Sequence, residues 1–486
     1  MLVIHNDPLI LLSPTPNSAC FRRLCILGLL FVMEELVLEE SKTEISGIQG
    51  NNWAERATSA AGLQEKSLNA GTRQFSNLDL ARERAAFTRW KTIENLDKYL
   101  IEFESNFIKS GGKVIWAQDI TDALEAILDI LHKANAKEVM KSKTNTASEI
   151  GLTAFLESQS IRSTESDTGD FIVQAAGEGA SHMVLPAMHK PVAEVSKLLQ
   201  DKIKYNGDGS PQDMVKAIRT HLRDKFRSAD AGITGCNFLV ADPGAIVILE
   251  NEGNAQLTAA LPKTHIVLAG IDKMLPSLND LDLFLPLLSA YGTGQNITAY
   301  NSIITGPRQS DELDGPEELY VILLDNGRSD VLAHEQQRTA LTCIKCGACQ
   351  TVCPVYGSSG AADFPSPIAA VTLPLQRSEH QHLAHATTLC GGCKDVCPVK
   401  IDIPRLLLEN RKYFVEQGNT PRGEKWFYFA WKKAMLKREI MSWTGVNARK
   451  HILEGLFKSR DGLRKMPSAG KEKSFNDWYR EKMNYK

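Results

Sequence analysis

The pattern of hydrophobic and polar positions predicts alternating helices and strands over residues 76–332. From Leu78 to Ser110 apolar residues recur every three or four positions, as they do on one face of a helix. Short apolar runs, typical of buried strands, occur at 113–117, 138–141 and 183–185. Helical spacing returns at 120–131, 192–204 and 212–226.

The middle of this region contains a predicted hairpin. Asp242-Pro243-Gly244 separates the apolar runs 238–241 and 245–250, and such residues favour a tight turn. Further strands are predicted at 265–269 and 319–324, with a leucine-rich helix between them. Strands and helices that alternate over this length predict an α/β domain with a mainly parallel sheet.

The amino-acid composition changes outside this region. Residues 333–410 combine cysteine, proline and helical stretches, and residues 411–486 are basic, aromatic and helical. Residues 34 to about 71 are polar and irregular, and we expect residues 1–75 to form a poorly ordered extension. An apolar stretch at 25–33 faintly resembles a signal peptide but is too short to span a membrane, and a true start at Met33 or later is an alternative. The predicted domains are therefore 1–75, 76–332, 333–410 and 411–486.

Seven cysteines lie close together near the C-terminus. Four have the spacing CxxCxxCxxxCP, and three follow as CxxCxxxCP: Cys343, Cys346, Cys349, Cys353, and then Cys390, Cys393 and Cys397. Thiolates are the ligands that iron–sulfur clusters prefer, and in two-cluster proteins the fourth cysteine of such a run binds the other cluster. This rule assigns Cys343, Cys346, Cys349 and Cys397 to one cluster. Cys353, Cys390 and Cys393 remain for the second.

The second run lacks its first cysteine, since that position holds Thr387. The first cluster is expected to be a [4Fe–4S] cluster with four thiolates. The second has three, which predicts either a [3Fe–4S] cluster or a [4Fe–4S] cluster with one iron held by water, by Thr387 or by another group.

Zinc and disulfides are the alternatives for these cysteines. Zinc sites need two well-separated pairs, and disulfide frameworks belong to small secreted domains, so both fit less well than iron and sulfide. Cys236 stands apart from the runs. It is either a redox thiol, the missing eighth ligand or, as a lone cysteine before an apolar strand more often is, a small buried hydrophobic residue.

Composition and charge limit the functional classes. A hydrophobic content of 43% and a charged content of 23% are ordinary for a soluble protein, and the cysteines imply a reducing, cytoplasmic location. The net charge is −2, although residues 405–486 hold 20 Lys and Arg against 9 Asp and Glu. This basic segment is expected to dock a partner or to pack on the cluster domain, with at most peripheral contact at the inner face of a membrane. Nucleic-acid binding is not expected.

Several polar or glycine-bearing segments are placed where predicted strands end. In an open α/β sheet the carboxyl ends of the strands form the ligand site, so these segments together predict a pocket. Lys143 could supply positive charge there, and Glu252 could act as a base or nucleophile. The segments are 141–144, 233–237, 250–254, 262–265 and 305–308. Each of them could instead form only a turn.

With these residues, the chain resembles the lactate utilization protein B family, the iron–sulfur subunits of bacterial L-lactate utilization complexes. The resemblance extends from about Ala81 to Trp443. The segment 356–363 departs from the family pattern, and residues 1–32 match nothing in it. The family's second run also has three cysteines. The matching stretches are 91–100, 141–152, 232–237, 250–254, 261–266, 304–308, 312–317, 343–354 and 389–403.

The resemblance implies an α/β lactate-utilization domain like those of sugar-phosphate isomerases and CoA transferases, followed by a helical ferredoxin-type domain. It implies a subunit that transfers electrons in a complex oxidising L-lactate to pyruvate, rather than a complete enzyme. The implied partners are a cysteine-rich subunit and a second subunit of the lactate-utilization type. The electron acceptor stays open.

Other functions remain open at this point. The chain could be the iron–sulfur subunit of a dehydrogenase for another 2-hydroxy acid or for glycerol 3-phosphate, although such subunits usually lack the α/β domain. It could also be an α/β enzyme with regulatory clusters, or carry clusters with a purely structural role. Fold alone does not decide among these reactions.

Overall fold

The structure is a computed structural model that describes residues 67–312 and 314–418, with single residues and short pieces between 426 and 436 and between 479 and 483. Residues 1–66 and most of 419–486 lie outside the described residues. The expectations for the signal-like stretch, for the start of the chain and for most of the basic C-terminal segment fall there. The chain divides into two compact units, Met1–Lys412 and Tyr413–Lys486.

A six-stranded parallel sheet forms the centre of the first unit. Its four inner strands are buried on both faces, which requires a layer of structure on each side of the sheet. The strand order explains how distant segments meet, because the first and last strands in sequence are neighbours. In spatial order the strands are β1 (Lys113–Ala117), β10 (Glu318–Leu324), β7 (Thr264–Gly270), β4 (Ala231–Thr234), β2 (Glu138–Lys141) and β3 (Arg162–Glu165).

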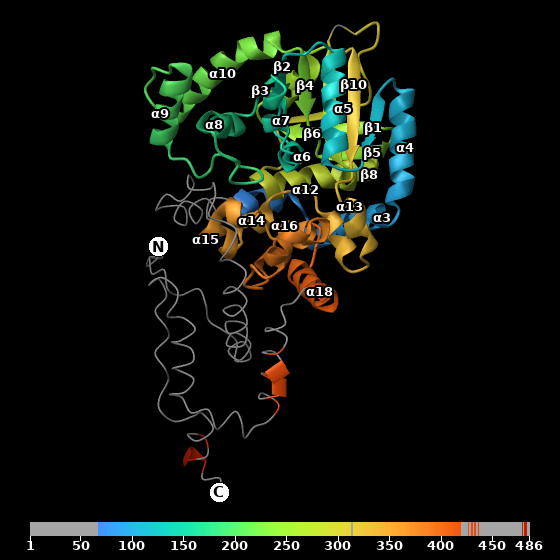
Figure 1. Ribbon diagram of the computed structural model, residues 1–486, viewed down its shortest axis with the longest axis vertical. Helices are drawn as coiled ribbons and strands as arrows, with labels where there is room; N and C mark the ends of the chain where they lie inside the picture. Colours follow the sequence, from blue (N-terminus) through green and yellow to red (C-terminus); the bar gives the residue numbers. More distant parts are fainter. Residues whose placement is uncertain are drawn as a thin grey trace. The chain divides into compact units, whose positions relative to one another are not determined.

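Helices between these strands cover the sheet. In Figure 1, α5 runs alongside β10, and α9 and α10 extend beyond β3. The helix α5 begins at a capping residue, Asp119, whose side chain accepts a hydrogen bond from Asp122 N. The helices up to β4 are α5 (Ile120–Lys133), α6 (Asn145–Glu149), α7 (Leu152–Ser158), α8 (Thr168–Ala176), α9 (Val192–Ile203) and α10 (Pro211–Ser228).

A second, four-stranded sheet contains the predicted hairpin. Strands β5 and β6 pair antiparallel around Asp242-Pro243-Gly244, as the sequence predicts. Two strands without a sequence signal flank them. The spatial order is β8 (Met274–Ser277), β5 (Phe238–Asp242), β6 (Ala245–Glu250) and β9 (Tyr300–Ile304). The intervening helical segments are α11 (Asn254–Ala260), η2 (Ile271–Lys273), η3 (Leu278–Asp280) and α12 (Leu281–Thr293).

Two local predictions are wrong. The helical pattern from Leu78 to Ser110 forms two helices, α3 (Leu78–Glu94) and α4 (Leu96–Lys109), because Asn95 leaves the helical conformation between them. Residues 183–185 form no strand. The N–H groups of Val184 and Leu185 both donate to Nδ1 of His182, so a side chain takes the donors that a strand would use. Residues 162–165 supply a strand of the parallel sheet instead.

The cysteine-bearing region consists of short helical segments. Figure 1 shows α14, α15 and α16 beneath α12, on the side of the molecule where α13 and α3 also lie. These segments are α13 (Arg328–Ala333), η4 (Gln337–Thr342), α14 (Ala348–Thr351), α15 (Pro354–Asp363), α16 (Ala369–Gln376), η5 (Ser378–Ala384), α17 (Gly392–Asp395) and α18 (Ile403–Glu416).

One hydrophobic core joins this region to the second sheet. Phe238 of β5 and Phe284 of α12 belong to the same cluster of buried side chains as Cys346, Tyr356 and Cys397. Residues 67–75 also join it: helical turns that include η1 (Thr72–Gln74) pack Leu68 and Phe75 against this core. The α/β part and the cysteine-bearing part therefore fold against each other within one compact unit. The four domain boundaries set from the sequence stay predictions.

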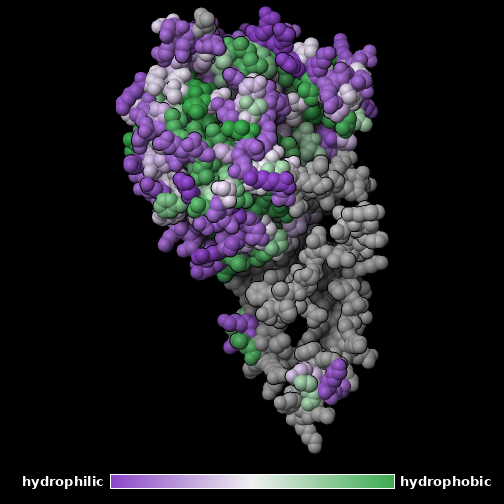
Figure 2. Space-filling model, turned by 180° about the vertical axis from the view of Figure 1, so that it is seen from behind, coloured by the Kyte–Doolittle hydropathy of each residue, from purple (hydrophilic) through white to green (hydrophobic). Residues whose placement is uncertain are grey.

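The described surface is mixed in character. Figure 2 shows hydrophobic and hydrophilic residues interspersed over the face that it displays. Among the described residues, no helix combines the length and the apolar character that crossing a membrane requires.

Candidate functional site

The first thiol group, as we call it, consists of Cys343, Cys346, Cys349 and Cys397. Cys346 interacts electrostatically with Cys343 and Cys397, and Cys349 with all three others. The chain brings three of these thiols together because two residues between them adopt left-handed backbone conformations, Lys345 with φ 59° and Gly347 with φ 79°. Cys397 arrives from the loop after α17.

The second thiol group consists of Cys353, Cys390 and Cys393. Cys393 interacts electrostatically with both others. Cys353 caps the N-terminus of α15, while Leu389 (φ 52°) and Gly391 (φ 90°) flank Cys390 in left-handed conformations. Cys349 also interacts with Cys393, so the two groups lie next to each other.

The two groups differ in exposure. Cys346 and Cys397 are buried, whereas Cys390 is exposed. Burial raises the pKa of the Cys397 thiol to about 11 and that of Cys393 to about 12, and it raises the pKa of Cys349 well above its usual value. Several thiolates held this close together need positive charge among them, and a metal core supplies it.

Backbone donors point at the sulfur atoms. Lys345 N lies 3.3 Å from Cys343 Sγ, and Ile401 N lies 3.4 Å from Cys397 Sγ. Hydrogen bonds of this kind stabilise negative charge on sulfur and are one means by which proteins set cluster potentials. The donor set therefore fits iron–sulfur clusters. Among the described residues no three His, Cys, Asp or Glu side chains are spaced for a single metal ion, whereas a cluster of several iron and sulfide ions is larger and holds its thiolates farther apart.

Thr387 and Cys236, the two residues considered as an additional cluster ligand, have other contacts in the structure. The hydroxyl of Thr387 accepts a hydrogen bond from Leu389 N at 3.2 Å. Cys236 is buried in the core beside Leu239 and Val267, and burial raises its pKa to about 11. Its electrostatic partners are Lys273 and Asp272. This environment is that of a small buried hydrophobic residue.

A cavity of about 320 Å³ adjoins the first thiol group, and we call it the strand-end cavity. It is lined by residues that follow β2, β4 and β6, that is, by the carboxyl ends of strands from both sheets. Ile344, Lys345 and Cys346 form part of its wall. A ligand in this cavity would therefore lie beside a residue of the first thiol group.

Both weak catalytic candidates from the sequence line this cavity. Lys143 donates to the carbonyl oxygen of Val184 at 2.6 Å, and burial lowers its pKa. Glu252 Oε2 accepts from Thr168 Oγ1 at 2.7 Å and from Thr168 N at 3.2 Å. Burial, with Asp167 nearby, raises the pKa of Glu252.

The structure brings three of the five strand-end segments together. Residues from 141–144, 233–237 and 250–254 line the cavity. The expectation for the other two is wrong: residues 262–265 lie at the start of β7 rather than its end, and 305–308 follow β9 without being among the described residues that line the cavity.

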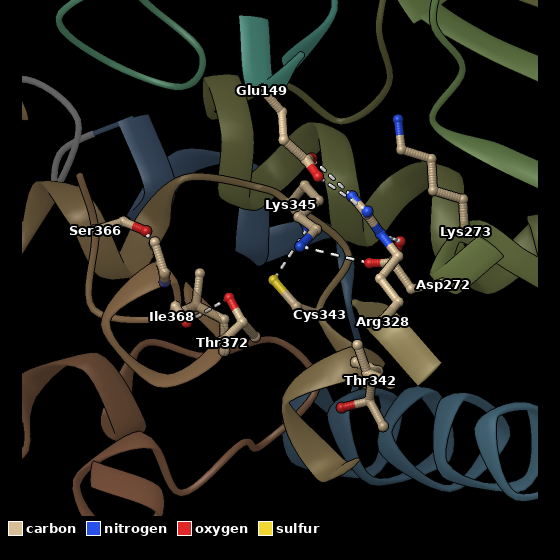
Figure 3. Close-up of polar contacts among 12 residues, drawn as sticks. Glu149, Asp272, Lys273, Arg328, Thr342, Cys343, Lys345, Ser366, Ile368 and Thr372 are labelled. Carbon is tan, nitrogen blue, oxygen red and sulfur yellow. Dashed lines mark hydrogen bonds and ion pairs between the residues drawn. The ribbon is translucent and has the colours of Figure 1, made fainter. Parts of the chain in front are cut away.

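A second cavity, of about 440 Å³, also borders residues 343–347, which we call the cysteine loop, through Lys345. Figure 3 shows a chain of charges along it, in which Arg328 lies between Glu149 and Asp272, each at 2.8 Å. Lys345 Nζ lies 3.5 Å from Asp272 Oδ2, and its charge also interacts with Cys343 (Figure 3). Lys273 and Lys345 line both cavities.

Sequence reasoning missed these charged residues. Lys345 could have been found, since it lies inside the cysteine motif itself. Asp272 and Arg328 follow strands β7 and β10, which are neighbours only because of the strand order. No spacing in the sequence signals that contact.

Two arginines of α3 hold the cysteine region in place. Arg82 donates to the carbonyl oxygens of Asp395 and Cys397, at 2.7 and 2.8 Å. Arg89 is fully buried, and its guanidinium donates to four backbone carbonyls. These belong to Asp272, Met274, Leu341 and Thr342. The last two directly precede Cys343.

Comparisons with known proteins agree with this arrangement. Residues 100–324 match the family model of the LUD domain, and residues 339–401 match that of the 4Fe-4S dicluster domain. The α/β fold followed by a ferredoxin-type region is thereby confirmed, and the second match supports iron–sulfur clusters as the cofactors.

Curated relatives match most of the chain. "Lactate utilization protein B" of Bacillus cytotoxicus is 37% identical over 426 residues, which cover 84% of this chain and 89% of that protein. "Lactate utilization protein B 2" of Bacillus mycoides is also 37% identical, with the same coverage. "Uncharacterized electron transport protein YkgF" of Escherichia coli is 36% identical over 82% of this chain and 87% of that protein.

Proposed function

The chain belongs to the lactate utilization protein B family, and we propose that it is the iron–sulfur electron-transfer subunit of a complex that oxidises L-lactate to pyruvate. Its partners in this proposal are a cysteine-rich subunit and a second subunit of the lactate-utilization type. We also propose a cytoplasmic location with at most peripheral membrane contact, supported by the absence of a disulfide pattern in the sequence.

One observation carries the proposal: seven thiols form two adjacent groups that differ in exposure. Cys346 of the first thiol group is buried and lines the strand-end cavity, and Cys390 of the second is exposed. Cys349 and Cys393 connect the groups electrostatically. The two thiol groups thus extend from a cavity to the surface, and a chain of clusters that transfers electrons requires such a path.

The ligands proposed for the first cluster are Cys343, Cys346, Cys349 and Cys397, and those for the second are Cys353, Cys390 and Cys393. The clusters would accept and donate single electrons. With three thiolates, the second site holds a [3Fe–4S] cluster, or a [4Fe–4S] cluster with a fourth ligand that is not cysteine.

The protein's own residues set the properties of this relay. The N–H groups of Lys345 and Ile401 donate to ligand sulfurs, and burial keeps water from Cys346 and Cys397. Lys345 adds a positive charge beside Cys343. Arg82 and Arg89 fix the backbone on either side of the first thiol group.

The proposal is tested with the full chain purified without oxygen, alone and combined with its two partner subunits. Iron and sulfide are counted, and electron paramagnetic resonance spectra are recorded before and after L-lactate is added. We expect cluster reduction by L-lactate only with the partners present. Replacing Cys390 by Ser should remove the second cluster and stop electron delivery to an external dye, while the first cluster is still reduced.

Three results would contradict the proposal. One is complete lactate oxidation by the partners with a chain whose first-group cysteines are replaced. Another is reduction by glycolate or glycerol 3-phosphate at lower concentrations than by L-lactate, which would favour a different dehydrogenase. An unchanged spectrum with all subunits and L-lactate present would favour a structural role for the clusters.

A further inference from the structure

Two lysines line the strand-end cavity without an ion pair. Lys143 donates to Val184 O, and Lys273 donates to Cys236 O at 2.5 Å. Within the described residues neither ammonium lies within 4.0 Å of a carboxylate. Each ammonium has three donors, so hydrogen-bonding capacity and positive charge remain for a ligand.

Lys273 differs in this respect from the charged residues around it. Arg328 is neutralised by Glu149 and Asp272, and Lys345 pairs with Asp272 and faces Cys343. Asp272 is thus already shared by two closer cations. Lys273 is half-buried and is the cation of this set that has no carboxylate of its own among the described residues.

One neutral group that lines the cavity also lacks a partner among the described residues. The Thr144 hydroxyl is buried and has no hydrogen-bond partner among the described residues, and Thr144 lines the cavity. Gly235 keeps the space beside it open, because a Cβ there would lie 2.5 Å from Thr144 Oγ1. A buried hydroxyl without a partner costs free energy unless a ligand or water satisfies it.

We propose that the strand-end cavity binds a small monocarboxylate, with Lys273 as the main anchor and Lys143 as a second positive charge. This inference deepens the proposed function and rests on it for the identity of the ligand, which would be L-lactate. It places substrate on this chain, next to Cys346, rather than on a partner subunit.

The carboxylates that line the cavity weigh against a dianion as its ligand. Asp167, Glu250 and Glu252 line it together with the lysines, so a dianion such as phosphate would meet repulsion. Glu250 is engaged, since its two oxygens accept from Ala255 N and Gln256 N. Glu252 uses one oxygen for both contacts with Thr168, which leaves its other oxygen for the hydroxyl of a 2-hydroxy acid.

The test measures binding of radiolabelled L-lactate to the full chain, purified without oxygen and without partner subunits, by equilibrium dialysis. We expect Lys273→Met to weaken binding by about tenfold or more and Lys143→Met to weaken it less, since charge-assisted hydrogen bonds are the strong ones. Propionate should compete, and phosphate should not. The matched control is Lys263→Met, because Lys263 precedes the same strand β7 at its other end and is exposed.

A second measurement uses the wild-type chain, so it tests the proposal even if the variants fail to fold. In the wild-type chain, L-lactate should protect Lys273 from acetylation by acetic anhydride, as read by mass spectrometry, while Lys263 stays reactive. Unprotected Lys273, wild-type affinity in Lys273→Met with normal iron content, or phosphate competing as well as propionate would each overturn the inference.

The outcome separates this inference from the proposed function. If the assembled complex reduces the clusters with L-lactate but the chain alone binds none, electron transfer stands and the cavity assignment is wrong. If the chain binds L-lactate but the assembled complex leaves the clusters oxidised, the cavity assignment stands and the electron-transfer function is wrong.

Discussion

The ammonium of Lys345 lies 3.5 Å from the carboxylate of Asp272. This contact ties the cysteine loop to the carboxyl end of the parallel sheet, because Asp272 follows β7 and Lys345 lies between Cys343 and Cys346. Burial opposes the charge on Lys345, but Asp272 and then Cys343 outweigh it and raise its pKa. A permanent positive charge therefore faces the first thiol group.

Replacing Lys345 by Met should make the reduction potential of the first cluster more negative. A positive charge favours the reduced form, which carries one more electron, so its loss disfavours reduction. We expect a shift of roughly 60 mV, which corresponds to a tenfold change for one electron. The measurement is a redox titration followed by electron paramagnetic resonance.

Two further variants check the electrostatic origin of that shift. Lys345→Arg keeps the charge and should keep the wild-type potential. Asp272→Asn leaves the cations in excess and should shift the potential in the opposite direction, although breaking this buried ion pair should lower the free energy of unfolding by about 3–5 kcal/mol. Shifts of the same sign in Lys345→Met and Asp272→Asn would argue against a charge effect.

Arg89→Met should destabilise the protein and reduce its iron content. The substitution leaves four buried carbonyl oxygens without their donor, and each such group costs about 1–3 kcal/mol. Unfolding in urea and iron analysis are the measurements. Arg84→Met, on the exposed face of the same helix, is the control and should change neither.

Gly347→Ala should lower stability more than Gly391→Ala does. Both glycines have positive φ, which costs an L-residue about 1–2 kcal/mol. Only at Gly347 would the new Cβ also meet neighbours, at 3.0 Å from Val184 Cγ2 and 3.2 Å from His182 Cε1. Equal losses in thermal unfolding would mean that His182 and Val184 do not pack against Gly347.

Asp170→Asn should stabilise the protein above pH 7. Burial, with Asp167 and Glu165 nearby and Lys143 in opposition, raises the pKa of Asp170 to about 7. The unfolded chain releases this proton near pH 4. The folded state therefore binds the proton more tightly, and its stability falls as the pH rises from about 4 to about 7.

In Asp170→Asn this part of the pH dependence of the free energy of unfolding should disappear. Its size is about 1.4 kcal/mol for each unit of difference between the pKa of Asp170 in the folded and in the unfolded state. Urea unfolding at pH 5.5 and pH 8 measures it. Exposed Asp129, changed to Asn, serves as the control. If the variant and wild type lose equal stability between these pH values, the Asp170 carboxyl is not protonated in the folded state.

Much of the fold could be predicted from hydrophobic patterns. Strands with continuous apolar runs, such as 319–324, were predicted because burial on both faces leaves a clear signal. Strand β3, with the sequence RSTE, gives no such signal, since its position at the sheet edge demands few apolar residues. The helix break at Asn95 was missed because the apolar spacing continues across it.

The residues of the candidate site could likewise be predicted only in part. The cysteine runs were found because cluster ligands must converge over short spacings, and that requirement is local. Lys273, Asp272 and Arg328 act through contacts between strands that are far apart in the sequence, so nothing nearby signals their role. Lys143 and Glu252 were identified as candidates, but only the folded chain shows that they line one cavity.

The shared hydrophobic core has a consequence for damage by oxygen. Cys346 and Cys397 belong to the same core as Phe238 of the second sheet and Phe284 of α12, and α12 supplies residues to the wall of the strand-end cavity. In the proposed function, a chain that lost its first cluster to air would loosen that wall as well. Inactivation would then extend from the redox centre to the ligand site, and such a chain would neither hold substrate nor accept its electrons.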